Sequence, residues 1–437
     1  MAKKEETTTM GMLEDILDRE NLNLAYRRVR GNNGAPGVDD MTARDLLTYY
    51  RQHRKEIHRT LMDGTYRPRP VLRVEIPKDN GTKRQLGIPV VLDRLIQQAI
   101  AQVLSKVYEP LFSDTSYGFR PKRSAIMAID KCKEYLNAGR CWTVDKDLEK
   151  FFDTVNHDRL LQLLSVRIRD GRVISLISRF LNAGAMVKGR RVRTPSGVPQ
   201  GGPLSPLLAN VMLNELDHEL ERRGHRFVRY ADDMVICCGS KASAQQALDH
   251  IIPYIEGKLL LKVNREKTVV AKATDIKFLG FGFYISREPP GTYASRIHQR
   301  SLEKLKDKVR RLTTERRAGT FDKWVVKFNR VVRGWANYFG HADSCNPLRD
   351  VDSWTRRRIR AVLLDRWKLG KTKEKRLMQY GLNVVEAKCI AYSPKGTWRL
   401  SATHQMHKAI TNGLIKAWGF LSFLECAKPL RRHLASL

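Results

Sequence analysis

The segment that decides the fold is Phe227-Val228-Arg229-Tyr230-Ala231-Asp232-Asp233-Met234-Val235-Ile236-Cys237-Cys238, in which two adjacent carboxylates separate two strand-forming halves. Aspartate is common in turns, so the simplest prediction is a plain hairpin. A turn between two buried strands can also direct neighbouring carboxylates into a cleft, where they repel each other unless a divalent cation compensates their charge. Because oxygen-only ligands favour magnesium, the turn is a candidate metal site.

A second acidic strand end lies upstream, in residues 144–153, which include Asp145, Asp147 and Asp153. Two-metal phosphoryl transfer needs carboxylates from separate elements, which hold two ions about 4 Å apart. One aspartate from this segment and the two at the turn would suffice. By themselves these acids fit a solvated helix start equally well, since Asp and Glu favour the first helical turn.

The charge of the chain indicates a polyanionic partner. Lys and Arg number 80 against 46 Asp and Glu, which gives a formal net charge of +34. Nucleic acid fits best, because its binding releases condensed counterions from the phosphates. A solvated basic surface, as in some ribosome-associated proteins, is the alternative, and it also implies RNA. The C-terminal third is a candidate binding surface, since residues 351–380 carry ten Lys or Arg against three acids.

The length of 437 residues predicts two to four modules. No apolar run approaches the roughly 20 residues that cross a bilayer, and the polar N-terminus does not resemble a secretory signal. We therefore expect a cytoplasmic protein without membrane association. The seven cysteines include no CxxC pair, so reduced thiols are expected instead of a zinc site.

Apolar spacing and turn residues predict the main elements. Residues 74–77 and 85–89 flank a Gly-containing connection and predict a hairpin with a basic tip. Helices are predicted over residues 93–111, 203–224, 301–317, 321–339 and 348–367. The last three are basic with apolar stripes and predict a small bundle. Four tryptophans interleaved with the C-terminal charges are predicted to anchor cores more often than to stack on bases: Trp354, Trp367, Trp398 and Trp418.

An ordered series of short motifs runs along the chain. Its central members are Asp147 to Phe152, Gly197 to Pro206, Tyr230 to Asp233, Leu261 to Lys267, and Phe278 to Gly280. Matching segments upstream and downstream are Gly34 to Asp39, Ile76 to Lys78 with Arg84 to Pro89, Ser116 to Pro121, Gly334-Trp335, and Gly396 to Arg399. The series closely resembles the reverse transcriptases encoded by group II introns, over nearly the whole chain.

This resemblance implies an α+β right-hand polymerase fold, with fingers, a palm that bears the acids on an antiparallel sheet, an α-helical thumb and a small basic C-terminal domain. We expect residues 1–65 to form the N-terminal extension and the start of the fingers, and residues 66–290 the fingers and palm. Residues 291–370 would form the thumb or maturase bundle, and residues 371–437 a basic, mainly helical DNA-binding domain. No His- and Cys-containing cluster follows, so the resemblance is to short forms without an endonuclease domain.

The resemblance also implies a catalytic metal site. Asp147, Asp232 and Asp233 would bind two Mg²⁺ ions, for which Mn²⁺ can substitute, and the backbone carbonyl of Leu148 is a possible further ligand. Phe152 would lie under the sugar and exclude a 2′ hydroxyl, because a fixed ring leaves no room for another oxygen; core packing is its alternative.

Other residues would bind the nucleotide. Lys78 and Arg84 would grip the triphosphate, with an exposed basic hairpin as the alternative. Gln200 would lie close to the incoming base or sugar. Lys267 is a candidate general acid for pyrophosphate, and Arg120 a candidate template or nucleotide contact, although a surface role fits both equally well.

The implied activity is that of an RNA-directed DNA polymerase, which extends a DNA or RNA primer on an RNA template with deoxynucleoside triphosphates. The same protein would act as a maturase that binds group II intron RNA, and it would contact target DNA. An alternative is the same chemistry domesticated for host DNA repair or defence. A splicing cofactor that only binds RNA is disfavoured by the intact set of three aspartates. The sequence leaves the oligomeric state open.

Overall fold

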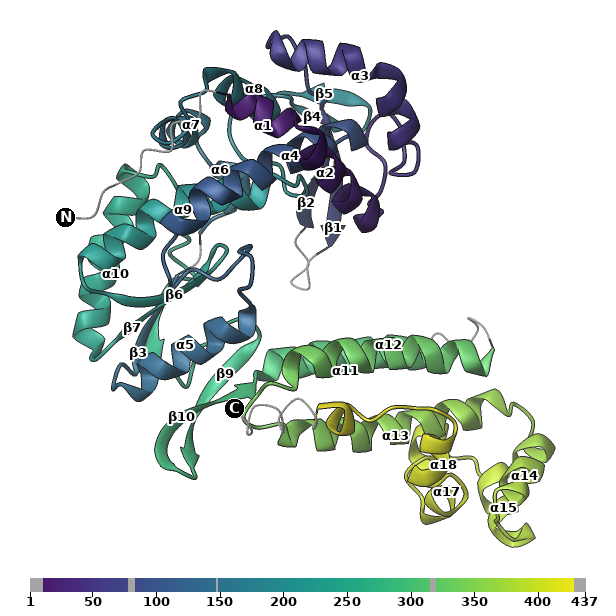
Figure 1. Ribbon diagram of the computed structural model, residues 1–437. Coiled ribbons are helices and arrows are strands. Elements are labelled where there is room, and N and C mark those ends of the chain that lie inside the picture. Colours follow the sequence, from purple (N-terminus) through teal and green to yellow (C-terminus); the bar gives the residue numbers. More distant parts are fainter. Residues whose placement is uncertain (1–10, 78–82, 147, 315–319, 428–437) are drawn as a thin grey trace. The chain divides into compact units, whose positions relative to one another are not determined.

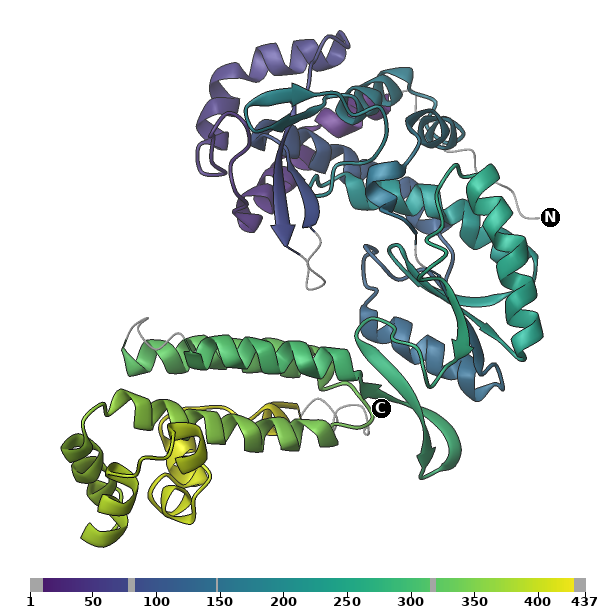
Figure 2. The same ribbon diagram turned by 180° about the vertical axis from the view of Figure 1, so that it is seen from behind.

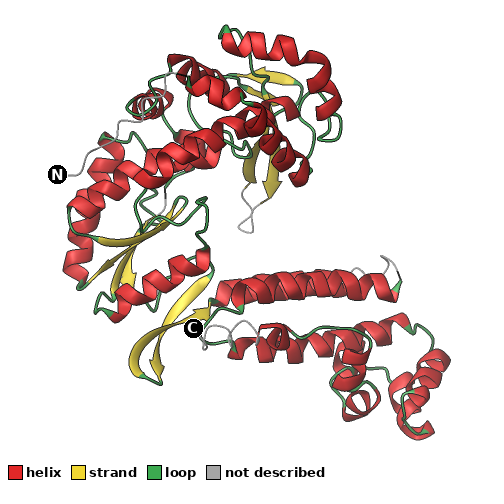
Figure 3. Ribbon diagram, viewed as in Figure 1, coloured by secondary structure: helices red, strands yellow, loops and turns green. Residues whose placement is uncertain are grey.

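The computed structural model describes residues 11–77, 83–146, 148–314 and 320–427 of the chain. It forms two compact units, Met1–Lys272 and Ala273–Leu437. The first unit combines helices with two four-stranded sheets, and the second is mainly helical with one two-stranded sheet (Figures 1 and 3). The predicted α+β class is therefore confirmed.

One sheet of the first unit contains the acidic turn. Its strand order is β6-β7-β3-β8, and neighbouring strands are antiparallel. The strands are β6 (Arg226–Tyr230), β7 (Asp233–Cys238), β3 (Trp142–Lys146) and β8 (Val269–Lys272). Helices α5 (Ala125–Asn137) and α10 (Lys241–Gly257) pack against this sheet. β7 is buried from Met234 onward, so its apolar residues fix the register that leaves Asp233 at the exposed end.

The other sheet of this unit contains the predicted basic hairpin. Its order is β2-β1-β4-β5, with β1 (Val71–Pro77), β2 (Lys83–Ile88), β4 (Ala185–Val187) and β5 (Arg190–Val192). β1 and β2 are antiparallel, which confirms the hairpin, whereas β1 and β4 are parallel. β1 is buried only at Val71 and is exposed over its last four residues. The hairpin is therefore an exposed ribbon anchored at its base.

The other helices of the first unit pack together with α10 around one hydrophobic core. They are α1 (Met12–Leu17), α2 (Arg19–Asn32), α3 (Leu46–Met62), α4 (Val91–Tyr108), the short 3₁₀ helix Glu109–Leu111, α6 (Phe151–Thr154), α7 (His157–Ser165), α8 (Gly171–Leu181) and α9 (Ser205–Arg222). α9 is the helix predicted over residues 203–224, and its polar Asn210, Asn214 and Asp217 are buried together with its apolar side chains. α9 is thus an internal helix, and its buried polar groups need partners inside the protein.

The second unit contains the predicted bundle. A hairpin of β9 (Phe281–Arg287) and β10 (Pro290–Ile297) precedes α11 (Gln299–Thr314), α12 (Phe321–Phe339) and α13 (Asn346–Arg366). α11 packs against both other helices, and Figure 2 shows α11 and α12 running alongside each other. Smaller helices follow: α14 (Gly370–Gln379), α15 (Val384–Ala391), α16 (Thr397–Leu400), α17 (His404–Ala409) and α18 (Asn412–Ala417).

The three long helices bury the predicted apolar stripe. On α12, Trp324, Phe328, Val332 and Phe339 are buried, and Trp335 of the same stripe is partly buried. Of the four C-terminal tryptophans, Trp354, Trp367 and Trp418 are half-buried and Trp398 is exposed, so none of them is fully buried as a core anchor would be. Trp418 packs edge-on against Phe321. None of the helices in the described residues is long and apolar enough to cross a bilayer.

Candidate active site

The acidic turn is a two-residue connection between β6 and β7. Tyr230 pairs with Asp233, so Ala231 and Asp232 form the loop. Ala231 has a φ of 57°, in the left-handed region that costs a non-glycine residue about 1 kcal/mol. Asp232 is half-buried and Asp233 is exposed, while the strands that hold them are buried. The buried hairpin thus presents two neighbouring carboxylates at its accessible end.

A loop around Gly197 lies against the segment that contains Phe152. The Val198 N–H donates to the Phe152 carbonyl (2.6 Å), and the Gly197 N–H donates to Val155 (2.8 Å). Gly197 has a φ of 93°, and a Cβ there would lie 2.9 Å from the carbonyl oxygens of both Phe152 and Asp153. Only glycine permits this approach. Phe152 is 6% exposed and its ring lies edge-on to that of Phe151, with the centroids 5.2 Å apart, so the loop and the ring form one packed wall.

The basic hairpin is joined to the same loop. The Gly87 N–H donates to the Gln200 carbonyl (2.8 Å), and Arg84 Nε donates to Gln200 Oε1 (2.5 Å). A Cβ on Gly201 would lie 2.7 Å from the Gly87 oxygen, so a side chain would force the two segments apart. Lys83 pairs with Glu75 (2.6 Å), and this hydrogen bond raises the pKa of Lys83. Arg84 therefore supplies positive charge at the rim of the site, whereas the charge of Lys83 is paired with Glu75.

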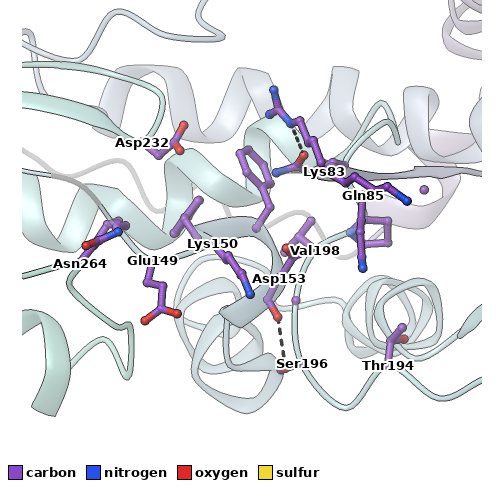
Figure 4. A pocket seen from close by; sticks show the side chains of 18 of the residues that line it. Lys83, Gln85, Glu149, Lys150, Asp153, Thr194, Ser196, Val198, Asp232 and Asn264 are labelled. Atoms are coloured by element: carbon purple, nitrogen blue, oxygen red, sulfur yellow. Dashed lines mark hydrogen bonds between the residues drawn. The ribbon is translucent and has the colours of Figure 1, made fainter. Parts of the chain in front are cut away.

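These elements enclose a cavity of about 1120 Å³. It brings together every described residue that the sequence assigned to the metal or nucleotide except Arg120: Arg84, Leu148, Phe152, Gln200, Asp232, Asp233 and Lys267. In the view of Figure 4, Asp232 and Asn264 lie at one end, Lys83 and Gln85 toward the other, and Lys150 between them. The carboxylates and the phosphate-binding candidates thus line one space large enough for a nucleotide.

Five cationic residues that were not assigned to the site from the sequence also line this cavity. They are Arg73, Lys83, Lys150, Arg193 and Arg265. The signal was present in the basic run Arg190-Arg191-Val192-Arg193, but nothing in the sequence placed that run beside the acidic turn. With these cations, the cavity suits a polyphosphate that also carries metal ions.

The donor set fits hard divalent cations. Asp232 and Asp233 offer carboxylate oxygens, and Leu148, which lines the cavity, offers its backbone carbonyl. Asp147 and Lys78 lie outside the described residues, so their expected roles stay predictions. Within the residues that the structure describes, no three His, Cys, Asp or Glu side chains gather as a metal-binding group.

Arg120 lies in a different environment. It is 8% exposed; its Nε donates to Glu109 (2.9 Å) and its Nη1 to the Ser113 and Ser116 carbonyls. It is not among the residues that line the cavity. Because its guanidinium is occupied by internal partners, Arg120 stabilises the loop before α5, and we leave it out of the proposed site.

Comparisons with known proteins agree with this geometry. Residues 76–283 match the family model described as reverse transcriptase (RNA-dependent DNA polymerase). Residues 302–381 match the model of the group II intron maturase-specific domain.

Individual relatives cover most of the chain. The group II intron-encoded protein LtrA of Lactococcus lactis subsp. cremoris is 30% identical, over 74% of this chain and 69% of that protein. Protein YkfC of Escherichia coli (strain K12) is 34% identical, over 62% of this chain and 81% of that protein. Among solved structures, a partial Cas6-RT-Cas1–Cas2 complex is similar at 25% identity, with a TM-score of 0.37, over 56% of this chain and 43% of that chain.

Proposed function

Because this chain belongs to the family of group II intron-encoded reverse transcriptases and maturases, which are RNA-directed DNA polymerases, we propose that the cavity between the acidic turn and the basic hairpin is its nucleotidyl-transfer site. The observation that carries this proposal is the meeting of Asp232 and Asp233 with Phe152, Gln200 and Arg84 around one cavity. Segments far apart in the chain supply these residues, and a plain hairpin turn would not need them.

The carboxylates would hold the divalent ions of the reaction. We assign Asp147, Asp232 and Asp233 as ligands of two Mg²⁺ ions, with the Leu148 carbonyl as a further ligand and Mn²⁺ as a substitute. When bound, such ions activate the attacking 3′ hydroxyl of the primer and stabilise charge on the leaving pyrophosphate. The turn provides two adjacent carboxylates on a buried hairpin, so little reorganisation is needed at the moment of reaction.

The wall of the cavity opposite the carboxylates, on the side of the basic hairpin, would bind the nucleotide. Arg84, together with Lys78, would neutralise the triphosphate, and Gln200 would hold Arg84 in place and lie close to the base or sugar. Phe152 would lie under the deoxyribose and exclude a 2′ hydroxyl. Lys267, which lines the cavity, would donate a proton to the leaving pyrophosphate. Arg84 bonds to Gln200, so the arginine is already directed to this wall.

The partners follow from the family and the charge. A net charge of +34 fits an RNA template with its DNA or RNA primer, group II intron RNA and target DNA. We propose that the maturase-matched residues 302–381, on the basic bundle of the second unit, contact the intron RNA, and that the protein works in the bacterial cytoplasm. The division into an N-terminal extension, fingers and palm, thumb and DNA-binding domain also stays a proposal.

Primer extension tests the polymerase site. Wild-type protein should extend a primer on an RNA template with deoxynucleotides and Mg²⁺, and Asp232→Ala with Asp233→Ala should reduce the rate at least about 1000-fold, since several kcal/mol of transition-state stabilisation are lost. Asp63→Ala with Asp158→Ala removes two exposed aspartates outside the cavity and is the matched control. Extension by the turn variant at the rate of the control would refute the assignment.

A further inference from the structure

A buried ion pair lies directly behind the acidic turn. Arg229 of β6 and Asp217 of α9 both have fully buried side chains. Arg229 Nε donates to Asp217 Oδ1 (2.8 Å) and Nη2 donates to Oδ2 (2.5 Å), which is a bidentate pair. Burying two charges costs several kcal/mol per ion in desolvation, so such a pair is weak evidence for a gain in stability. Its geometry suggests another purpose.

The remaining nitrogen of the guanidinium reaches the turn itself. Arg229 Nη1 donates to the Ala231 carbonyl (3.0 Å) and to Asn210 Oδ1 (2.9 Å). That carbonyl belongs to the peptide that joins Ala231 to Asp232, and Ala231 has the left-handed φ of 57°. Rotation of this peptide would move the Asp232 side chain. The guanidinium of Arg229 therefore fixes the orientation of the Ala231–Asp232 peptide, and with it the direction of the Asp232 side chain.

A third segment, residues 115–118, is in contact with the turn. Asn210 Nδ2 donates to the Gly118 carbonyl (2.9 Å). A Cβ on Gly118 would lie 2.1 Å from the Ala231 nitrogen, so the two backbones are in direct contact. The backbone of Arg229 also bonds on both sides to this segment, from Tyr117 N–H (2.8 Å) and to Thr115 oxygen (2.9 Å). Arg229, Asn210 and Gly118 thus close a ring of contacts around Ala231.

Taking the cavity as the nucleotidyl-transfer site proposed above, we propose that Arg229 is a positioning residue, which with Asp217 and Asn210 sets the orientation of the Asp232 and Asp233 carboxylates toward the divalent ions. The charge of Arg229 is neutralised by Asp217, so its action on the turn is geometric. Outer partners of this kind typically change metal affinity by about 10- to 100-fold.

Arg229→Lys separates charge from geometry. Lysine keeps a positive charge for Asp217, but one ammonium group cannot reproduce the planar fork that reaches Asp217, Asn210 and Ala231 together. We expect Mn²⁺ binding to the protein without nucleotide, measured by electron paramagnetic resonance, to weaken about tenfold. Hydrogen exchange of the peptide 227–238 should accelerate, and the Mg²⁺ concentration for half-maximal primer extension should rise about tenfold.

Two further variants make the result decisive. Asn210→Ala removes one partner of Nη1 and the bond to Gly118 but leaves the ion pair, so it should shift Mn²⁺ binding in the same direction by a smaller factor. It replaces Arg229→Lys if that variant does not fold. Arg360→Lys alters an equally buried arginine, 2% exposed, which bonds to Ile410 oxygen and Asn412 in the second unit, and it should leave Mn²⁺ binding unchanged.

The outcomes distinguish this inference from the proposed function. Wild-type Mn²⁺ affinity and exchange rates in both Arg229→Lys and Asn210→Ala would overturn the positioning role, even if the wild-type protein extends primers. Failure of the wild type to extend primers would refute the proposed function, while the Mn²⁺ and exchange measurements would still report on the geometry of the turn. A loss of thermal stability with unchanged metal affinity would show that the network is structural only.

Discussion

Two buried aspartates of the first unit support the two walls of the cavity in different ways. Asp217, behind the acidic turn, is paired with the guanidinium of Arg229. Asp93, at the start of α4 near the base of the basic hairpin, is 1% exposed and accepts from the Tyr66 hydroxyl (2.6 Å) and the Arg69 N–H (3.0 Å). The acidic turn is therefore supported by an ion pair. The base of the basic hairpin is supported by a carboxyl group that accepts hydrogen bonds from uncharged donors.

The difference matches what each wall must do. In the proposed site, the spacing of the turn carboxylates would decide whether two ions bind, and the turn is fixed by several hydrogen bonds at once. The hairpin presents Arg84 on a ribbon whose first strand is exposed over its last four residues, and the Arg84 side chain bonds to Gln200 of the neighbouring loop. We infer that the wall formed by the acidic turn is preorganised and that the wall formed by the basic hairpin is free to adapt to its substrate.

The largest effect on the adaptable wall is expected from Arg84→Ala. This change removes a cation that lies at the cavity and bonds to Gln200, so both phosphate binding and transition-state stabilisation decrease. We expect kcat/KM for the deoxynucleotide to fall about 100-fold, close to 3 kcal/mol. Steady-state primer extension with varied nucleotide measures it.

Lys83→Ala is the matched comparison for Arg84→Ala. Lys83 also lines the cavity, but it is exposed and its charge is paired with Glu75. Its loss should change kcat/KM by no more than about threefold, because exposed pairs contribute little. Equal losses in the two variants would show that general positive charge, and not the directed arginine, binds the phosphates.

A smaller, selective effect is expected from Phe152→Val. The valine side chain leaves space under the sugar, so the preference for deoxynucleotides over ribonucleotides should fall about tenfold while deoxynucleotide incorporation is largely kept. Competition between the two nucleotide types at one template position measures the ratio. Phe151→Val is the control for a general repacking effect, since that ring also lines the cavity, is 2% exposed and packs edge-on against Phe152. Unchanged sugar selectivity in Phe152→Val would reject the gate and leave core packing as the role of this ring.

The acidic turn, the basic hairpin, α9 and the long helices of the second unit could all be predicted from the sequence, because each depends on local spacing or turn residues. The joining of the hairpin to the Gln200 loop could not, since the partners Gly87 and Gln200 are far apart in the chain. The contacts of Arg229 with Asn210 and Asp217 behind the acidic turn could not be predicted either, for a related reason. Asn210 and Asp217 resemble solvent-facing positions of an amphipathic helix, and only burial reveals them as partners of Arg229. A charged residue between Val228 and Tyr230, in an otherwise apolar strand, was the available signal.

The smallest effect sharpens the contrast between the two buried aspartates. Burial raises the pKa of Asp93 to about 7, against which the Tyr66 and Arg69 hydrogen bonds act. Because the folded-state pKa lies above the unfolded value, the folded protein binds more protons between about pH 4 and pH 7. Asp93 therefore contributes stability that is full below pH 4 and is lost as the pH rises to 7.

Asp93→Asn removes this proton uptake. Between pH 5 and pH 8, the free energy of unfolding should fall more for the wild type than for the variant. The difference between the two decreases should be no more than about 3 kcal/mol, since each pKa unit corresponds to about 1.4 kcal/mol. Urea denaturation followed by circular dichroism at both pH values measures the difference. Asp63→Asn alters an exposed aspartate and should leave the pH dependence as in the wild type. If Asp93→Asn and Asp63→Asn show the same pH dependence, Asp93 is ionised in the folded protein throughout this range, and the hairpin base is held by a charge as the turn is.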